Sequence, residues 1–357
     1  MKHQNNLQQN QPANPFGTSR STLFHLRLTA AFAAVIGFAA LAQETQALSG
    51  TFEQLKPGDI LYADSGDAVN GGFIIKVDPT SGQQTVISSG GNLIQPFDVA
   101  LDIEGQIVVS DTGLCCTLVR IDPSSGKQSV ITDNSHGTLG VPGGIALARD
   151  GDILVANTQA ILRVNPATGD TQIVSSGGYF VCPLAITLAE SGDLFVANMA
   201  FPAEILRVDP RNGAQTVLSR GRYLKNPQSI VAEGADIYVT DVATSDGNFG
   251  VGRVIHVDSR TGAQKVVSEG GYLVGPVGIA VDASGQIVVG DPYTINPESP
   301  DLYDGGIIRI DPLTGSQTLI ARGHGSFVNP RGLAIVQSGA PHQHPVTGKS
   351  WRRKSTN

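Results

Sequence analysis

Six short apolar runs, each ending in Asp or Asn, recur along the chain. They are Ile60–Asp64, Val108–Asp111, Leu154–Asn157, Phe195–Asn198, Tyr238–Asp241 and Val288–Asp291. The apolar residues within a run are consecutive rather than alternating with polar ones, which is typical of strands covered on both faces. The pattern therefore predicts six buried β-strands.

Three further strands are predicted around each run. The strand after it ends in a turn of the Asp-Pro-x-x-Gly type, in which Pro and Gly favour a tight hairpin. The next strand opens with a Gln-Thr-Val-like segment, and the last follows a Gly-rich loop and a Pro. The turn segments are Lys76–Gly82, Arg120–Gly126, Arg163–Gly169, Arg207–Gly213, His256–Gly262 and Arg309–Gly315. The last strands of the unit are Asp98–Leu101, Gly144–Leu147, Ala185–Leu188, Ser229–Ala232, Gly278–Val281 and Gly332–Ile335.

A four-stranded unit that repeats every 41 to 53 residues or so is the signature of a β-propeller. The sequence thus predicts an all-β fold, a six-bladed β-propeller with four-stranded antiparallel blades. The final strand, Gly332–Val336, has no strands after it. We expect it to join the first blade and close the ring, and the 43 Gly and 20 Pro agree with many short strands and tight turns.

The N-terminal segment resembles an export signal. The run Leu28–Ala42 contains no charged residue and ends in Ala-Leu-Ala, and basic residues precede it. A transmembrane anchor is the alternative, but the run is shorter than the roughly 20 residues that span a bilayer. We expect a signal peptide at 1–42, a lead-in segment at 43–57, the propeller at 58–336 and a flexible basic tail at 337–357. The mature protein is then secreted or periplasmic, without a stable membrane span.

The folded body is strongly acidic once these ends are set aside. Residues 43–336 hold all 31 acidic residues but only 17 of the 24 basic ones, because three lie in the leader and four in the tail, so the net charge is −14. Such a surface repels phosphate backbones, and we expect no binding to nucleic acid.

The three cysteines are an odd number for an exported chain. Cys115 and Cys116 are adjacent and Cys182 is distant, and no zinc-binding spacing is present. Free thiols are one interpretation. A disulfide between Cys182 and one member of the pair is the other, and it requires the two loops to meet.

The loops after the six Asp or Asn residues vary most in length, from the short Asn157–Gln159 to Asp291–Gly306. Variable loops on a rigid scaffold commonly carry binding residues, so we expect the functional face there. Its acidic residues are Asp64, Asp67, Asp98, Asp111, Asp241, Asp246, Asp291, Glu298, Asp301 and Asp304. Such oxygen ligands suit Ca²⁺ or Mg²⁺. The alternative is that the Asp or Asn of each run caps its own turn.

Asp98 departs from the repeat, because the matching positions are Gly, Ala or Ser. It is therefore the leading candidate for a metal ligand or an acid–base group. His136 and His324, in matching Gly-rich loops, are candidate bases. The candidate ligand-binding residues on this face are Arg331, Asp291, Asp301 and Asp304.

The unit Pro276–Asp291 (PVGIAVDASGQIVVGD) resembles the NHL repeat, and looser copies cover residues 58–336. NHL-like six-bladed propellers include the streptogramin lyases and the SMP-30/gluconolactonase family, so the resemblance implies a metal-assisted lyase or lactone hydrolase at the central channel. The gluconolactonase pattern is a Glu, an Asn and an Asp around one ion. It would fall here on Asp98 in place of the Glu, on Asn157 or Asn198, and on Asp241.

Two functions follow from the sequence. The first is a binding or interaction module that takes a small molecule, glycan or protein on the variable-loop face. The alternative is a divalent-metal-dependent hydrolase or lyase with its site at the central channel. We expect a monomer in either case.

Overall fold

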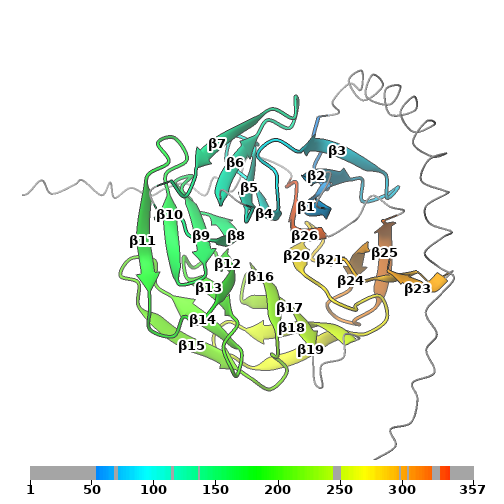
Figure 1. The fold of residues 1–357 in the computed structure, drawn as a ribbon. Coiled ribbons are helices and arrows are strands. Elements are labelled where there is room, and N and C mark those ends of the chain that lie inside the picture. Colours follow the sequence, from blue (N-terminus) through cyan, green and yellow to red (C-terminus); the bar gives the residue numbers. More distant parts are fainter. Residues whose placement is uncertain are drawn as a thin grey trace, which may run out of the picture. The chain divides into compact units, whose positions relative to one another are not determined.

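The computed structural model describes residues 54–67, 71–113, 116–135, 137–243, 251–296, 299–303, 305–323 and 330–337. They form six four-stranded antiparallel sheets placed around a centre (Figure 1). The predicted six-bladed propeller is therefore confirmed. The predicted signal peptide at 1–42 lies outside the described residues. In the described part of the chain, no helix has the length and apolar character needed to cross a bilayer.

The blades are numbered here in chain order, each from its inner to its outer strand. Blade 1 contains β26 (Pro330–Ile335), β1 (Ile60–Asp67), β2 (Gly71–Val77) and β3 (Gln84–Ser89). Blade 2 contains β4 (Pro96–Leu101), β5 (Ile107–Asp111), β6 (Thr117–Ile121) and β7 (Gln128–Thr132). Blade 3 contains β8 (Pro142–Leu147), β9 (Ile153–Asn157), β10 (Ala160–Val164) and β11 (Thr171–Ser176).

The second half of the ring has the same plan. Blade 4 contains β12 (Pro183–Leu188), β13 (Leu194–Asn198), β14 (Glu204–Val208) and β15 (Gln215–Arg220). Blade 5 contains β16 (Pro227–Glu233), β17 (Asp236–Ala243), β18 (Val251–Asp258) and β19 (Gln264–Glu269). Blade 6 contains β20 (Gly278–Val281), β21 (Ile287–Asp291), β24 (Gly306–Ile310) and β25 (Gln317–Arg322), and its long loop forms the hairpin of β22 (Ile295–Asn296) and β23 (Ser299–Tyr303).

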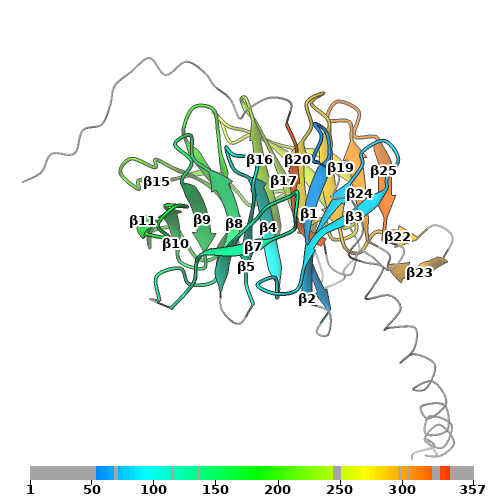
Figure 2. The ribbon, with the colours of Figure 1, turned by 90° about the horizontal axis from the view of Figure 1, so that it is seen from above.

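The last strand closes the ring, as the sequence predicts. β26 pairs antiparallel with β1, with Ile335 opposite Ile60 and Ala334 opposite Leu61. Blade 1 is thus built from both ends of the domain. Each blade has one loop that follows its second strand and one loop that leads into its inner strand. Because the strands are antiparallel, these two loops lie on the same face of the propeller. Loops gather at both ends of the strands (Figure 2), and the face with these two loop sets is called the variable face below.

The hydrophobic core lies between neighbouring blades. In one cluster Leu61 and Ile74 of blade 1 pack with Val99 and Ile107 of blade 2, and all four are almost fully buried. Each inner strand is therefore covered on both faces, which explains its unbroken apolar sequence.

A polar clamp joins consecutive blades at the outside. At the junction of blades 1 and 2, the side-chain amide of Gln128 donates to Oγ of Ser88 (3.0 Å) and to the carbonyl of Gly90 (2.9 Å), and it accepts from the backbone N–H of Asn92 (2.7 Å). Equivalent pairs are Ser175 with Gln215, Ser219 with Gln264, and Ser268 with Gln317. The recurring Gln of the third strand is thus an inter-blade contact. At the junction of blades 2 and 3 its place is taken by Thr171.

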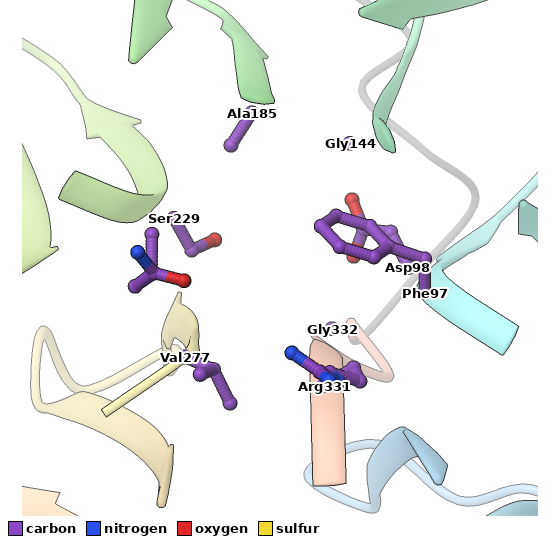
Figure 3. Close-up of a pocket in the computed structure, with 9 residues that line it drawn as sticks. Phe97, Asp98, Gly144, Ala185, Ser229, Val277, Arg331 and Gly332 are labelled. Atoms are coloured by element: carbon purple, nitrogen blue, oxygen red, sulfur yellow. The ribbon is translucent and has the colours of Figure 1, made fainter. Parts of the chain in front are cut away.

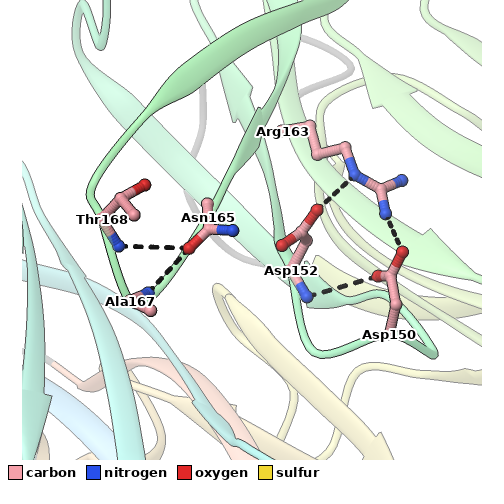
Figure 4. Close-up of polar contacts among 6 residues, drawn as sticks. All are labelled: Asp150, Asp152, Arg163, Asn165, Ala167 and Thr168. Atoms are coloured by element: carbon pink, nitrogen blue, oxygen red, sulfur yellow. Dashed lines mark hydrogen bonds and ion pairs between the residues drawn. The ribbon is translucent and has the colours of Figure 1, made fainter. Parts of the chain in front are cut away.

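The basic residue before each Asp-Pro-type turn also has a structural partner. In Figure 4, Arg163 contacts Asp150 and Asp152, with 2.6 Å from its Nε to Oδ2 of Asp152. The other pairs are Lys76–Asp59, Arg120–Asp102, Arg207–Asp193, His256–Asp236 and Arg309–Asp282. A side-chain contact that recurs in all six blades belongs to the scaffold rather than to a single site.

Candidate functional site

The Asp and Asn residues that end the second strands act as caps on the variable face. Asp291 accepts backbone N–H bonds from Val274 (2.7 Å) and Gly275 (2.9 Å) at Oδ2 and from Tyr293 (2.8 Å) at Oδ1. It therefore ties the loop that enters blade 6 to the loop after β21. Asp111 does the same in blade 2, through Ile94, Gln95 and Gly113. The capping interpretation is confirmed at these positions.

Three of the four residues in the predicted ion site also accept hydrogen bonds from backbone N–H groups. Asn157 accepts from the backbone of Gln159 and Ala160, and Asn198 from that of Val181 and Cys182. Asp241 accepts from the backbone of Lys225 and Asn226. Among the described residues, no group of three or more His, Cys, Asp and Glu side chains could hold a metal ion. The Ca²⁺ or Mg²⁺ site stays a prediction.

Burial raises the pKa of these cap carboxyls. The pKa of Asp291 rises to about 6, because desolvation outweighs the three N–H bonds that favour the charged form. The pKa values of Asp111 and Asp241 are raised for the same reason. Each capping carboxylate therefore stabilises its loops through hydrogen bonds, while its burial destabilises its own charged form.

Asp98 lies on β4, just after a register shift between Pro96 and Asp98. Such a bulge redirects the side chain that follows it. Oδ2 of Asp98 accepts from the backbone N–H of Ile145 in blade 3 (2.9 Å), and Oδ1 from that of Val99 (2.9 Å). Burial nevertheless raises the pKa of Asp98 to about 7. The neighbouring inner strand is close, because a Cβ added at Gly332 would collide with this carboxylate.

Asp98 stands at the mouth of the central channel, between two cavities. The cavity at the variable face has a volume of about 20 Å³, room for about one water molecule. Asp98, Ser229 and Arg331 line it together with Phe97 and Val277 (Figure 3). The cavity further along the channel has a volume of about 240 Å³ and is lined mainly by aliphatic side chains, with Asp98 and Ser229 at its boundary. The structure thus brings together two of the candidate residues, Asp98 and Arg331.

Two further candidates, Asp291 and Asp301, do not line either cavity of the channel. Asp291 is fully buried in its cap, and Asp301 lies in β23, in the hairpin of blade 6. His136, His324 and Asp304 lie outside the described residues. Their proposed roles stay predictions.

Of the cysteines, Cys116 and Cys182 do not form a disulfide with each other. Cys115 lies outside the described residues.

A hollow over blade 3 is a feature of the variable face that the sequence analysis missed. It has a volume of about 990 Å³, and no charged side chain lines it. The lining residues come from the loops around Gly140, Thr158 and Phe180 and from the outer strand near Ile173. Two departures from the repeat favour an open space here, the short loop Asn157–Gln159 and the replacement of the clamp Gln by Thr171. Both departures are visible in the sequence.

Apolar side chains are exposed at and beside this hollow. Ile173 is 68% exposed and Val181 is 65% exposed, and both line it. Nearby on the variable face, Phe201 is fully exposed in the loop after β13. The stretches 137–141, 158–160, 177–184 and 199–203 contain no charged residue, although the folded body is acidic. A surface without charged residues and with several exposed apolar side chains is typical of a protein–protein contact.

No family model matches this sequence. No curated protein matches it either. Among solved structures, a chain of the nidogen/laminin complex is similar, with a TM-score of 0.62 and 15% identity over 78% of this chain and 99% of that one. TolB from Acinetobacter baumannii is similar with a TM-score of 0.58 and 16% identity over 84% of this chain and 70% of that one. At these identities the likeness concerns the fold alone: the chain is a six-bladed β-propeller of the general kind found in these two structures.

Proposed function

We propose that this protein is an interaction module that binds a protein partner through the hollow over blade 3. The observation that carries the proposal is the uncharged lining of that hollow beside exposed Ile173 and Val181. Cores of protein–protein interfaces are depleted in charge and contain apolar side chains. A space of about 990 Å³ is large enough for a peptide segment or a projecting loop.

Two further points support a protein as the partner. One of the similar propellers was solved in a complex of nidogen with laminin. In addition, an acidic body disfavours anionic ligands at long range, whereas an uncharged contact surface avoids the cost of burying unpaired charge. We also propose that the repeats are of the NHL type, and that the mature protein works in a secreted or periplasmic location.

The metal-dependent alternative has less support, because most of its predicted ligands do not line the channel. Of its four predicted ligands, only Asp98 lines either cavity of the channel. The other three are engaged with backbone groups of the variable face. We therefore place the interaction function first.

A photo-crosslinking amino acid at Val181 identifies the partner. The matched control is the same amino acid at Leu313, which is 88% exposed and lies in the turn between β24 and β25 of blade 6. We expect one protein to be crosslinked at position 181 and not at position 313. Crosslinking of the same proteins at both positions would contradict the proposal.

The purified partner then permits a quantitative test. Val181→Asp and Ile173→Asp place a charge in the contact, and we expect each to weaken the affinity at least about tenfold, as for residues at the centre of an interface. The control Leu313→Asp should leave the affinity unchanged. Calorimetric titration of the three variants gives the comparison, and unchanged affinity in both hollow variants would refute the assignment.

A further inference from the structure

Arg331 is a cation without a partner at the channel mouth. It lies on β26 and is half-buried, and within the described part of the chain its guanidinium forms no hydrogen bond and no ion pair. Other arginines of the scaffold, such as Arg163 and Arg309, contact a carboxylate. A partly desolvated guanidinium that lacks such a contact favours an anion from outside.

Neutral polar groups stand beside this cation. Ser229 lines the same cavity, and its hydroxyl makes no hydrogen bond within the described part of the chain, so it is able to donate one. Gln228 lines the cavity too, with its side-chain nitrogen held by Asn226. Figure 3 shows Arg331, Ser229 and Asp98 turned toward a common space. The cavity has room for about one water-sized group, so a ligand enters it with a terminal polar group only.

When Asp98 is ionised, its negative charge repels an anion at the channel mouth. The strands packed against β4 are β1, β5, β8 and β26, and the other inner strands face Asp98 across the channel. The carboxyls on β1 and β5, Asp64 and Asp111, accept backbone N–H bonds of their own loops and do not line the channel. Of the residues that line the two channel cavities, only Asp98 and Arg331 have titratable side chains. No second acid or base therefore compensates a change of charge on Asp98. Its protonation decides whether the mouth is net positive or neutral.

We propose that the channel mouth is a proton-linked binding site for a carboxylate group, which Arg331 pairs with, Ser229 donates to, and protonated Asp98 accommodates. A planar carboxylate fits one guanidinium in a bidentate pair, and a single negative charge matches a single cation. The carboxylate belongs to a free organic acid or to the C-terminus of a polypeptide. This site is separate from the hollow over blade 3 and does not depend on the function proposed for it.

The direction of the pH dependence follows from linkage. The bound anion favours neutral Asp98, so binding takes up a proton and is stronger at low pH. With the pKa of Asp98 at about 7, the neutral fraction falls roughly tenfold between pH 6 and pH 8. We expect the affinity for a carboxylate to fall by about the same factor.

The test uses two carboxylate probes and the full propeller. Acetate represents a free acid, and N-acetyl-glycylglycine represents a chain end, with its C-terminal amide as the uncharged comparison. Titration at constant ionic strength is followed by the side-chain Nε–H resonance of Arg331 at pH 6 and pH 8. We expect saturable shifts with both acids, about tenfold weaker at pH 8, and none with the amide. If the peptide binds more tightly than acetate, the site is assigned to the C-termini of polypeptides. If the two bind equally, the site is assigned to free organic acids.

Three variants decide between this site and general surface attraction. For all of them the titration is followed by a backbone amide resonance at the channel mouth that shifts in the wild type. Arg331→Gln should weaken binding at least tenfold, whereas Arg222→Gln, which removes a cation from the loop between β15 and β16 on the same face, should not. Asp98→Asn should bind with equal affinity at pH 6 and pH 8. The absence of saturable binding, or wild-type affinity in Arg331→Gln, would overturn the proposal, and so would a full pH dependence in Asp98→Asn. The Arg331 result stands by itself should Asp98→Asn fold poorly.

Discussion

Replacing Asp291 by Ala is expected to lower the free energy of unfolding by about 3–5 kcal/mol. Three backbone N–H groups, those of Val274, Gly275 and Tyr293, lose their acceptor in a place where Asp291 itself is fully buried. Each buried donor left without a partner costs about 1–3 kcal/mol, and removal of a poorly solvated carboxylate offsets part of that sum. Urea denaturation at pH 7 measures the difference.

The repeat itself provides the matched control for this variant. In blade 4 the equivalent residue is Asn198, whose Oδ1 accepts two backbone N–H bonds and whose Nδ2 donates to the carbonyl of Tyr179. Asp291→Asn should therefore lose much less stability than Asp291→Ala. Asp122→Ala, in an exposed turn of blade 2, should lose far less stability than Asp291→Ala. If Asp291→Ala loses as little stability as Asp122→Ala, the Asp291 cap does not stabilise the fold.

The second large effect concerns pH and Asp98. Its pKa is about 7 in the folded protein, against an ordinary value of 3.8 that it regains on unfolding. The folded state therefore binds this proton more tightly, and the stability that it contributes is complete below pH 4 and is lost as the pH rises to about 7. At about 1.4 kcal/mol for each unit of pKa shift, the contribution amounts to about 4 kcal/mol.

Urea denaturation of the wild type and Asp98→Asn at pH 5 and pH 8 isolates this contribution. The other carboxyls with raised pKa values, such as Asp291, are present in both proteins, so their effects cancel in the comparison. We expect the wild type to lose about 3 kcal/mol more than the variant between the two pH values. Parallel losses would mean that Asp98 titrates at its ordinary value in the folded protein.

The channel mouth was partly predictable from the sequence. Asp98 stands out because Gly, Ala or Ser occupies its place in every other blade, and Arg331 precedes the closing strand on the same rim. The predicted association of Asp98 with Asn157, Asn198 and Asp241 came from a family resemblance. In the structure those three side chains turn to the backbone of nearby loops, which a residue type alone does not reveal.

The hollow over blade 3 shows a different limit. The short loop Asn157–Gln159 and Thr171 in the place of Gln are both legible in the chain, yet each is unremarkable by itself. They matter only together, because the loop, the strand β11 and the loops from blades 2 and 3 border one space. The volume of that space depends on the packing between blades.

What the sequence alone determined is the repeat: six units, four strands in each, and a last strand that pairs with the first blade. This is possible because strand patterns and Pro or Gly turns are local, and each of them is read six times. Only the tertiary structure decided the surroundings of Asp98 and Arg331. Gly332 and Asp98 meet across the closure of the ring, although more than 200 residues separate them in the chain. Burial, unpaired charge and raised pKa values arise from such distant neighbours, and no local pattern encodes them.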